Sequence, residues 1–306
     1  MIRFLGARVL GAALVLWVVA SLTFLAVMAS GDPITAALQS TGASPEMIDQ
    51  VRTELGYDRP LAVQYVDFLA HAVRGDFGES FRYGKDAMGL VAGRLPNTIA
   101  LALAALAVTV ALGVPLALAA SWRPNSPVDR LVSLVCAGGQ AIPNFVLGPV
   151  LLLVFAVAIP LFPVSGTTAP FAIVLPALTL AAYPVARLVR VLRAGILEAR
   201  SADYVRTARS KGLRPSRIVS RHVLANAMLP SVTVLGLQVA GTLGGAVVVE
   251  TVFSWPGVGS LARDALMSSD VNLALAVVVA FAAAVLVVNL VTDAVYALVD
   301  PRIRLT

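Results

Sequence analysis

The residues that could carry catalysis or hold a metal are few and scattered. The 306-residue chain has two histidines, His71 and His222, and neither stands in an H-E-x-x-H zinc pattern. No G-x-S-x-G nucleophile turn occurs. The two lysines, Lys85 and Lys211, do not end a G-x-x-x-x-G-K-[ST] phosphate loop. We therefore expect no catalytic residue, no metal site, and no ATP bound by this chain through such a loop.

Polar side chains inside long apolar runs are the more informative candidates. Such side chains are costly in hydrocarbon and are often functional, although an amide can also hydrogen-bond between helices. Gln140 and Asn144 flank Pro143 in a break of one apolar run. The candidates for a polar pathway or gate are Gln140, Asn144, Gln238, Glu250 and Asn289.

One carboxylate near the end of an apolar run, Asp293, needs a partner. We expect it to form a structural ion pair with Arg187 or Arg190 rather than to relay protons. The single cysteine, Cys136, lies inside another apolar run and is expected to pack there as a small hydrophobic residue.

The composition indicates that these residues are surrounded by a lipid bilayer. The chain is 58% hydrophobic and 13% charged, with a mean hydropathy of +0.87, well beyond the values of soluble domains. A spanning helix needs about 20 mostly apolar residues. Five runs without Lys, Arg, Asp or Glu meet this need: 9–29, 98–120, 131–161, 231–249 and 273–290. A sixth, 171–186, contains Pro176 and Pro184 and is expected to run on past Arg187. The fold class predicted is an all-α integral membrane protein with about six transmembrane helices.

Loop charge orients these spans, because Lys and Arg accumulate on the cytoplasmic side. Residues 187–221 carry ten basic residues against Glu198 and Asp203. The segment 31–96 has nine acidic and six basic residues, and 250–272 has three acidic residues against Arg263. We therefore place 187–221 and both termini in the cytoplasm. The net charge of +6 follows from this topology, so no nucleic-acid partner is expected.

Three parts follow along the chain. Residues 1–30 form an N-terminal transmembrane helix and 31–96 an extracytoplasmic helical segment. Within that segment, one helix is expected to start at Pro45 behind the cap Ser44, and a second to run from Pro60 to Gly75. Residues 97–306 form a core of five transmembrane helices, with a cytoplasmic loop at 187–229.

That loop carries the most distinctive pattern. The stretch from Ser201 to Gly212 predicts a short helix, since Asp203 suits its first turn and Gly212 supplies a stop. Tyr204, Val205 and Ala208 are expected to share a narrow apolar face. A compact helix tied to two spans can convert a push from a partner into helix movement.

At these residues the chain resembles the permeases of binding-protein-dependent ABC importers, whose cytoplasmic loop reads E-A-A-x3-G-x9-I-x-L-P. Aligned on Gly212, the pattern is matched at Ala208 and Leu224. The departures are Arg206 at the Glu, Thr207 at the first Ala, His222 at the Ile and Ala225 at the Pro. The sequence from Asp203 to Gly212 is similar to the corresponding sequence in the dipeptide and oligopeptide (Dpp/Opp-type) branch of this family. Further matches to that branch are Gly31-Asp32-Pro33, 55–61, 75–80, 95–98 and 250–259.

The resemblance implies a type I ABC importer permease bundle in a bacterial plasma membrane. This subunit would form half of a pathway for peptides, and a second similar permease would form the other half. Its further partners would be membrane lipid, two ATP-binding ATPase subunits and an external substrate-binding protein. ATP and Mg²⁺ would bind to the ATPases, and this chain would hold no cofactor. The residues implied in coupling to the ATPase are Tyr204, Arg206, Thr207, Ala208 and Gly212.

Other interpretations stay open. A nickel or other small-solute permease would share these motifs, because the binding protein selects the cargo first. A self-sufficient secondary transporter should carry ion-coupling carboxylates at mid-membrane, and the clear spans have none away from their ends. An intramembrane enzyme is a more distant alternative.

The topology is tested by labelling introduced cysteines with a membrane-impermeant thiol reagent in intact cells. Ala43→Cys should react and Ser216→Cys should not, because the first residue lies outside and the second in the basic loop. The opposite labelling pattern would mean that the two loops are placed the wrong way round.

Overall fold

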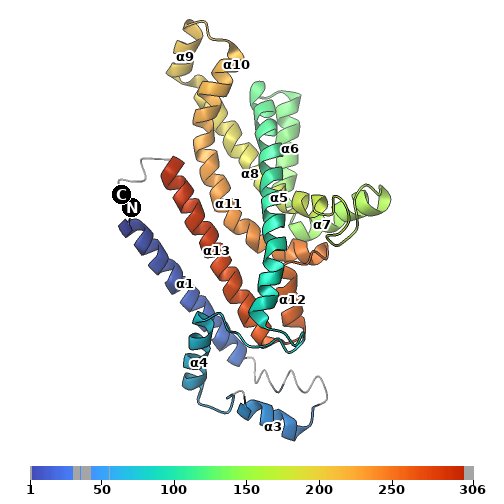
Figure 1. Ribbon diagram of the computed structural model, residues 1–306. Helices are drawn as coiled ribbons and strands as arrows, with labels where there is room; N and C mark the ends of the chain where they lie inside the picture. Colours follow the sequence, from blue (N-terminus) through green and yellow to red (C-terminus); the bar gives the residue numbers. More distant parts are fainter. Residues whose placement is uncertain (1, 30–34, 36–42, 55, 300–306) are drawn as a thin grey trace. The chain divides into compact units, whose positions relative to one another are not determined.

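The computed structural model describes residues 2–29, 35, 43–54 and 56–299, which form helices joined by turns (Figure 1). An isolated antiparallel bridge joins Glu79 to Asp86. The α-helices are α1 (Ile2–Ala29), α3 (Pro45–Glu54), α4 (Leu61–Val73), α5 (Ala87–Trp122), α6 (Pro127–Ala141), α7 (Asn144–Leu152), α8 (Val174–Ser201), α9 (Asp203–Ser210), α10 (Pro215–Ile218), α11 (Leu224–Val252), α12 (Val258–Met267) and α13 (Val271–Val299). The π-helical turns are η1 (Leu153–Ala158) and η2 (Val219–Val223). The predicted all-α class is confirmed.

Among the described residues, four helices are long and apolar enough to cross a membrane, and up to six spans result if each of two bent pairs counts as one. The four lie in α1, α5, α8 and α13. The α8 helix runs from Val174 to Ser201, so the predicted extension past Arg187 is confirmed. The α5 helix begins at Ala87, earlier than the apolar run that predicted it.

The third apolar run, 131–161, is bent at the Pro143 break noted in the sequence. Residues 127–141 and 144–158 are helices bent by 111° at the Pro143 break, so this stretch is a broken span or a re-entrant loop. Proline lacks the N–H that a continuing helix needs and disfavours a helical residue before it. Ile142 accordingly adopts an extended conformation. The entry to the predicted fifth span also bends, by 49°, between 216–228 and 230–239 at Pro230.

The described residues divide into two units, which are considered separately. The first contains 1–98 and 256–291, and the second contains 99–255 with 292–299. These units cut across the three predicted parts, because 256–291 groups with the N-terminal residues. The division at residues 30 and 96 stays a prediction.

In the first unit, the two outer helices form where the sequence places them. Helix α3 starts at Pro45, and the Ser44 hydroxyl accepts a hydrogen bond from the Met47 N–H at 3.3 Å. Helix α4 packs on α1 through aromatic rings, with Phe24 stacked on Phe68 at 5.2 Å between centroids. A hydrogen bond of 2.6 Å between the hydroxyls of Ser21 and Tyr65 adds a polar link.

A buried carboxylate anchors the outer loop of the same unit. Asp270 is 1% exposed and stands before α13. Its carboxylate accepts hydrogen bonds from the Ser80 hydroxyl, the Arg82 N–H and the Leu273 N–H. One side chain therefore caps a helix and holds a loop that is distant in sequence.

A second link joins the start of α5 to the turn before α12. The Asn97 side-chain amide donates to the Pro256 carbonyl at 2.8 Å, and the Thr98 hydroxyl accepts from the Val258 N–H at 2.8 Å. Side chains of the 95–98 motif thus bind the backbone of the 250–259 motif, and both motifs carried the family resemblance.

The second unit is built around α8, which packs extensively on α11 and α6. Small residues allow these close approaches. A Cβ placed on Gly195 would stand 3.1 Å from the Ala227 carbonyl oxygen, and one on Gly139 would stand 3.2 Å from that of Ala182. The cysteine prediction is confirmed, since Cys136 is buried in this core.

Asp270→Ala should loosen the outer loop, because it leaves two buried donors and one part-buried donor without this acceptor, at a cost of roughly 3 kcal/mol. Trypsin cleavage after the exposed Arg82 and Lys85 should become faster. The control is Asp67→Ala, which removes only the exposed pair with Arg59. Equal cleavage rates in the two variants would contradict this assignment.

Candidate functional site

The basic loop folds as a short helix between two long ones. Helix α9 runs from Asp203 to Ser210, as predicted, and Figure 1 shows it with α10 at the end of the α8 and α11 ribbons. Gly212 has a φ of +73°, a conformation that side-chain-bearing residues rarely adopt. The Gly212 N–H donates to the Arg209 carbonyl at 2.9 Å and the Leu213 N–H to that of Ala208 at 3.3 Å. The predicted glycine stop is confirmed.

The apolar face of α9 points into the protein. Val205 is 0% exposed and Ala208 is 6% exposed, and both belong to a core that includes Ile196, Ile218 and Val223. Tyr204 does not share this face, since it is 42% exposed. The predicted grouping is confirmed for Val205 and Ala208, whereas Tyr204, one turn from Ala208, lies toward the exposed side of the helix.

The outward surface of α9 consists of the other coupling candidates. Tyr204, Arg206 and Thr207 are exposed, and so is Gly212. Arg206 forms an exposed ion pair of 3.6 Å with Asp203, worth little in water. The exposed residues of α9 thus include an aromatic and a cationic side chain, whereas Ala208 is buried beneath them.

Two arginines on α8 fix the base of the loop. Arg193 donates to both carboxylate oxygens of Asp129, at 2.7 Å each, and the Asp129 side chain is 4% exposed. Arg200 donates to the Ser121 carbonyl at 2.6 Å, near the end of α5, where a cation suits the helix dipole. Sequence reasoning missed this clamp, although Ser126, Pro127 and Asp129 form a recognisable helix start.

A cavity of about 240 Å³ opens among α7, α8 and α11 in the second unit. Two helical faces line it, each with residues at positions i, i+3, i+4 and i+7. These faces are Leu180, Tyr183, Pro184 and Arg187 on α8, and Gln238, Gly241, Thr242 and Gly245 on α11. Asn144 enters from the start of α7, and Leu237 completes the wall.

Gln238 is the unusual member of this wall. It is 8% exposed, and both its Nε2 and its Oε1 lack a hydrogen-bond partner. A buried polar atom without a partner costs about 1–3 kcal/mol. Such a cost at the middle of a long apolar helix is typical of a functional residue.

The five pathway candidates do not gather at one place. Gln238 and Asn144 meet in the cavity, together with Arg187, which sequence reasoning had assigned only to an ion pair. Gln140 is half-buried on α6 and does not line this cavity, and Asn289 is exposed on α13. The side chain of Asp293 lies outside the described residues, so its pairing with Arg187 or Arg190 stays a prediction.

Glu250 is not at a surface. It is 0% exposed, and nearby Phe253 and Trp255 are 2% and 5% exposed in an apolar core. The sequence predicted Glu250 as a pathway or gate residue, and its side chain has no exposed surface. A role for Glu250 as a gate stays a prediction.

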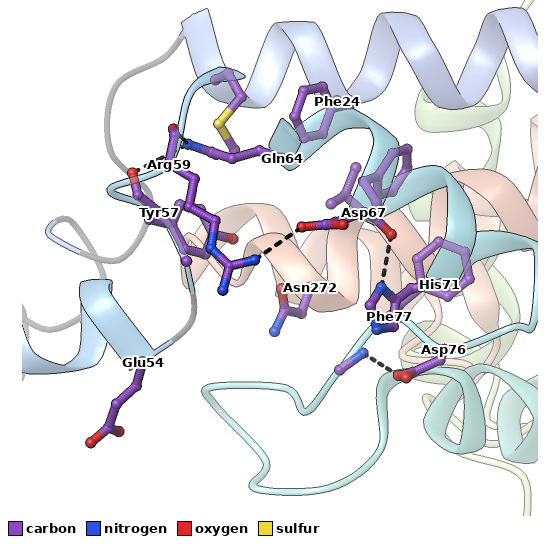
Figure 2. Close-up of a pocket in the computed structure, with 15 residues that line it drawn as sticks. Phe24, Glu54, Tyr57, Arg59, Gln64, Asp67, His71, Asp76, Phe77 and Asn272 are labelled. Atoms are coloured by element: carbon purple, nitrogen blue, oxygen red, sulfur yellow. Dashed lines mark hydrogen bonds and ion pairs between the residues drawn. The ribbon is translucent and has the colours of Figure 1, made fainter. Parts of the chain in front are cut away.

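The first unit holds a larger pocket of about 420 Å³, lined in part by residues of the 55–61 and 75–80 motifs (Figure 2). Arg59 pairs with Asp67 at 3.4 Å across it, and the His71 ring contacts the Asp67 carbonyl at 2.7 Å. Glu54 and Asp76 add further carboxylates to the wall. Among the described residues, no group of three or more His, Cys, Asp or Glu is arranged to hold a metal ion.

Together, the long apolar helices, the helical loop and the polar cavity define a transport permease. A family model for the binding-protein-dependent transport system inner membrane component matches residues 110–305, and one for the N-terminal part of such components matches 1–102. The chain belongs to this family, and it is an inner membrane component of a transport system.

Curated relatives cover almost the whole chain. The oligopeptide transport system permease protein AppB of Bacillus subtilis is 37% identical, over 90% of each chain. The glutathione transport system permease protein GsiC of Escherichia coli K12 is 37% identical, over 99% of each chain. Among solved structures, an inward-facing MetNI methionine ABC transporter matches with a TM-score of 0.57 at 20% identity, over 70% of this chain and 97% of that one. At this identity the structural match shows the fold alone, which is that of an ABC importer permease.

The buried ion pair between Arg193 and Asp129 predicts how single and double substitutions change the stability of the protein. Arg193→Leu should lower the free energy of unfolding by about 3–5 kcal/mol, because it leaves the Asp129 carboxylate buried without its partner. The double variant Asp129→Leu/Arg193→Leu should recover part of this loss. Thermal unfolding in detergent measures both, and a double variant no more stable than Arg193→Leu would contradict the buried pair.

Proposed function

We propose that this chain is one of two permease subunits of an ATP-driven peptide importer. The observation that carries the proposal is the α9 helix, whose exposed face is presented on a loop held by two long helices and a buried ion pair. Support comes from family membership and from the relatives whose names specify oligopeptide and glutathione transport. The partners would be a second permease, two ATPases and an external binding protein.

Peptides are the favoured cargo because the relatives named for oligopeptides and for glutathione, a tripeptide, match 90% and 99% of the chain. A nickel or other small-solute cargo remains the alternative. The cavity favours a solute with hydrogen-bonding groups, since amide, hydroxyl and guanidinium groups all line it. ATP and Mg²⁺ would bind to the ATPases, and the isolated chain would hydrolyse no nucleotide.

The contact with the ATPase would be made by Tyr204, Arg206, Thr207 and the backbone at Gly212. An exposed tyrosine beside a cation suits insertion into a groove that carries acidic residues. Val205 and Ala208 would transmit the movement inward, because they pack against the ends of α8 and α11. With both termini in the cytoplasm, this surface would face the cytoplasmic ATPases.

Substitutions on the outward face test this role. In the full complex reconstituted in liposomes, Arg206→Glu and Tyr204→Ala should each reduce ATP-driven peptide uptake by roughly tenfold, the loss typical of an interface anchor. The thermal stability of the subunit should not change, because both side chains are exposed.

The matched control is Arg123→Glu, the same charge change on an exposed arginine of the neighbouring turn after α5. It should leave uptake within twofold of the native chain. Ala208→Trp is unsuitable, because Ala208 is buried and its replacement would disturb folding as well as docking. Native uptake in Arg206→Glu and Tyr204→Ala would exclude α9 as the coupling surface.

A further inference from the structure

We propose that the cavity lined by Arg187, Gln238 and Asn144 is a subsite for the carboxyl-terminal residue of a peptide. The inference rests on the proposed function and adds to it which part of the cargo the permease recognises. It begins with Gln238, which is buried and whose amide nitrogen and oxygen both lack a partner. Gln238 is also among the residues that line the cavity.

The free groups of the cavity match a peptide end. A glutamine amide has hydrogen-bond donors and an acceptor in one plane. It can therefore donate to the carbonyl of a peptide group and accept from its N–H. Arg187 adds a guanidinium, which has donors only and binds carboxylates in a forked geometry. Among the described residues that line the cavity there is no Asp or Glu. A carboxylate would be attracted there, and an ammonium group would be repelled.

The helix chemistry of the wall supports a polar ligand. Pro184 has no N–H, so it cannot give the Leu180 carbonyl its regular helical hydrogen bond. On the opposite wall, Gly241 and Gly245 leave the face of α11 without side chains beside Gln238. The Asn144 amide nitrogen lies 3.5 Å from where a Cβ of Gly245 would be. The same Cβ would stand 3.2 Å from Leu180 Cδ1, so glycine relieves a tight contact with this wall residue.

The size of the cavity decides how much of a peptide it holds. Sites for whole small ligands usually measure about 300–1,000 Å³. A cavity of about 240 Å³ therefore suits one terminal residue with its carboxylate and the preceding peptide group. The rest of the cargo would extend away from the wall, so that peptides of different sequence share one contact.

Protection of an introduced cysteine tests the subsite directly in the full complex. Gly241 lines the cavity, is exposed, and has nothing within 4 Å of an added Cβ. In a Cys136→Ala background, Gly241→Cys should react with N-ethylmaleimide, and trialanine should slow the reaction. Trialanine amide should protect with roughly tenfold lower affinity, because it lacks the charge for Arg187. Gly244→Cys, equally open but outside the cavity, is the control and should show no protection.

Adding Gln238→Leu or Arg187→Met should abolish the protection of Gly241→Cys by trialanine. The labelling rate of Gly241→Cys without peptide should not change, and this unchanged rate would show that the cavity still forms. Equal protection by trialanine and its amide would overturn the inference, and so would no protection by either. A Gly241→Cys that never reacts would also overturn it, since the partner permease would then fill the cavity. ATP-driven trialanine uptake, measured separately, distinguishes the peptide subsite from the proposed importer function. Uptake without protection of Gly241→Cys would reject the subsite. Protection without uptake would reject the importer function.

Discussion

The packing of α8 against α11 and α6 is the constraint on which the second unit depends. Apolar helices gain nothing from leaving lipid for one another, so their association needs close backbone approach and specific polar contacts. Gly195 and Gly139 permit that approach, since any side chain there would meet a neighbouring carbonyl. The Arg193–Asp129 pair supplies a specific polar contact. Because both devices act on α8, the helix can move only together with the elements around it.

This arrangement connects the loop to the cavity. The inner face of α9 belongs to the same core as Leu192 and Ile196 of α8 and Ala227 of α11. Further along, the same two helices present Arg187 and Gln238 to the cavity. If a partner displaced α9, the movement would reach the cavity walls through α8 and through α11, which bends by 49° at Pro230.

Local signals in the sequence were sufficient for the elements that depend on local physics. Pro45 behind Ser44, and Gly212 after α9, begin and end helices because their own backbone preferences require it. Length and hydropathy likewise located α1, α5, α8 and α13. The bend of 111° at Pro143 was harder to predict, because an apolar run has the same composition whether it spans the membrane or turns back.

Tertiary features could not be predicted in the same way. Arg193 and Asp129 come from different helices, and only the fold shows that they meet. Arg187 and Gln238 were each noted as isolated polar residues, and their shared cavity depends on the register of α8 against α11. Glu250 was placed outside because acidic residues favour external loops, but the continuation of α11 buries it.

The central claim is that ATP hydrolysed by partner subunits drives peptide transport through this chain. The most direct measurement is the accumulation of labelled trialanine in liposomes that contain this permease, its partner permease and the two ATPases, with ATP on the ATPase side and the binding protein on the other. The account predicts accumulation against the gradient that stops when ATP, the binding protein or this subunit is omitted. Accumulation by this subunit alone without ATP, driven by an ion gradient, would contradict it.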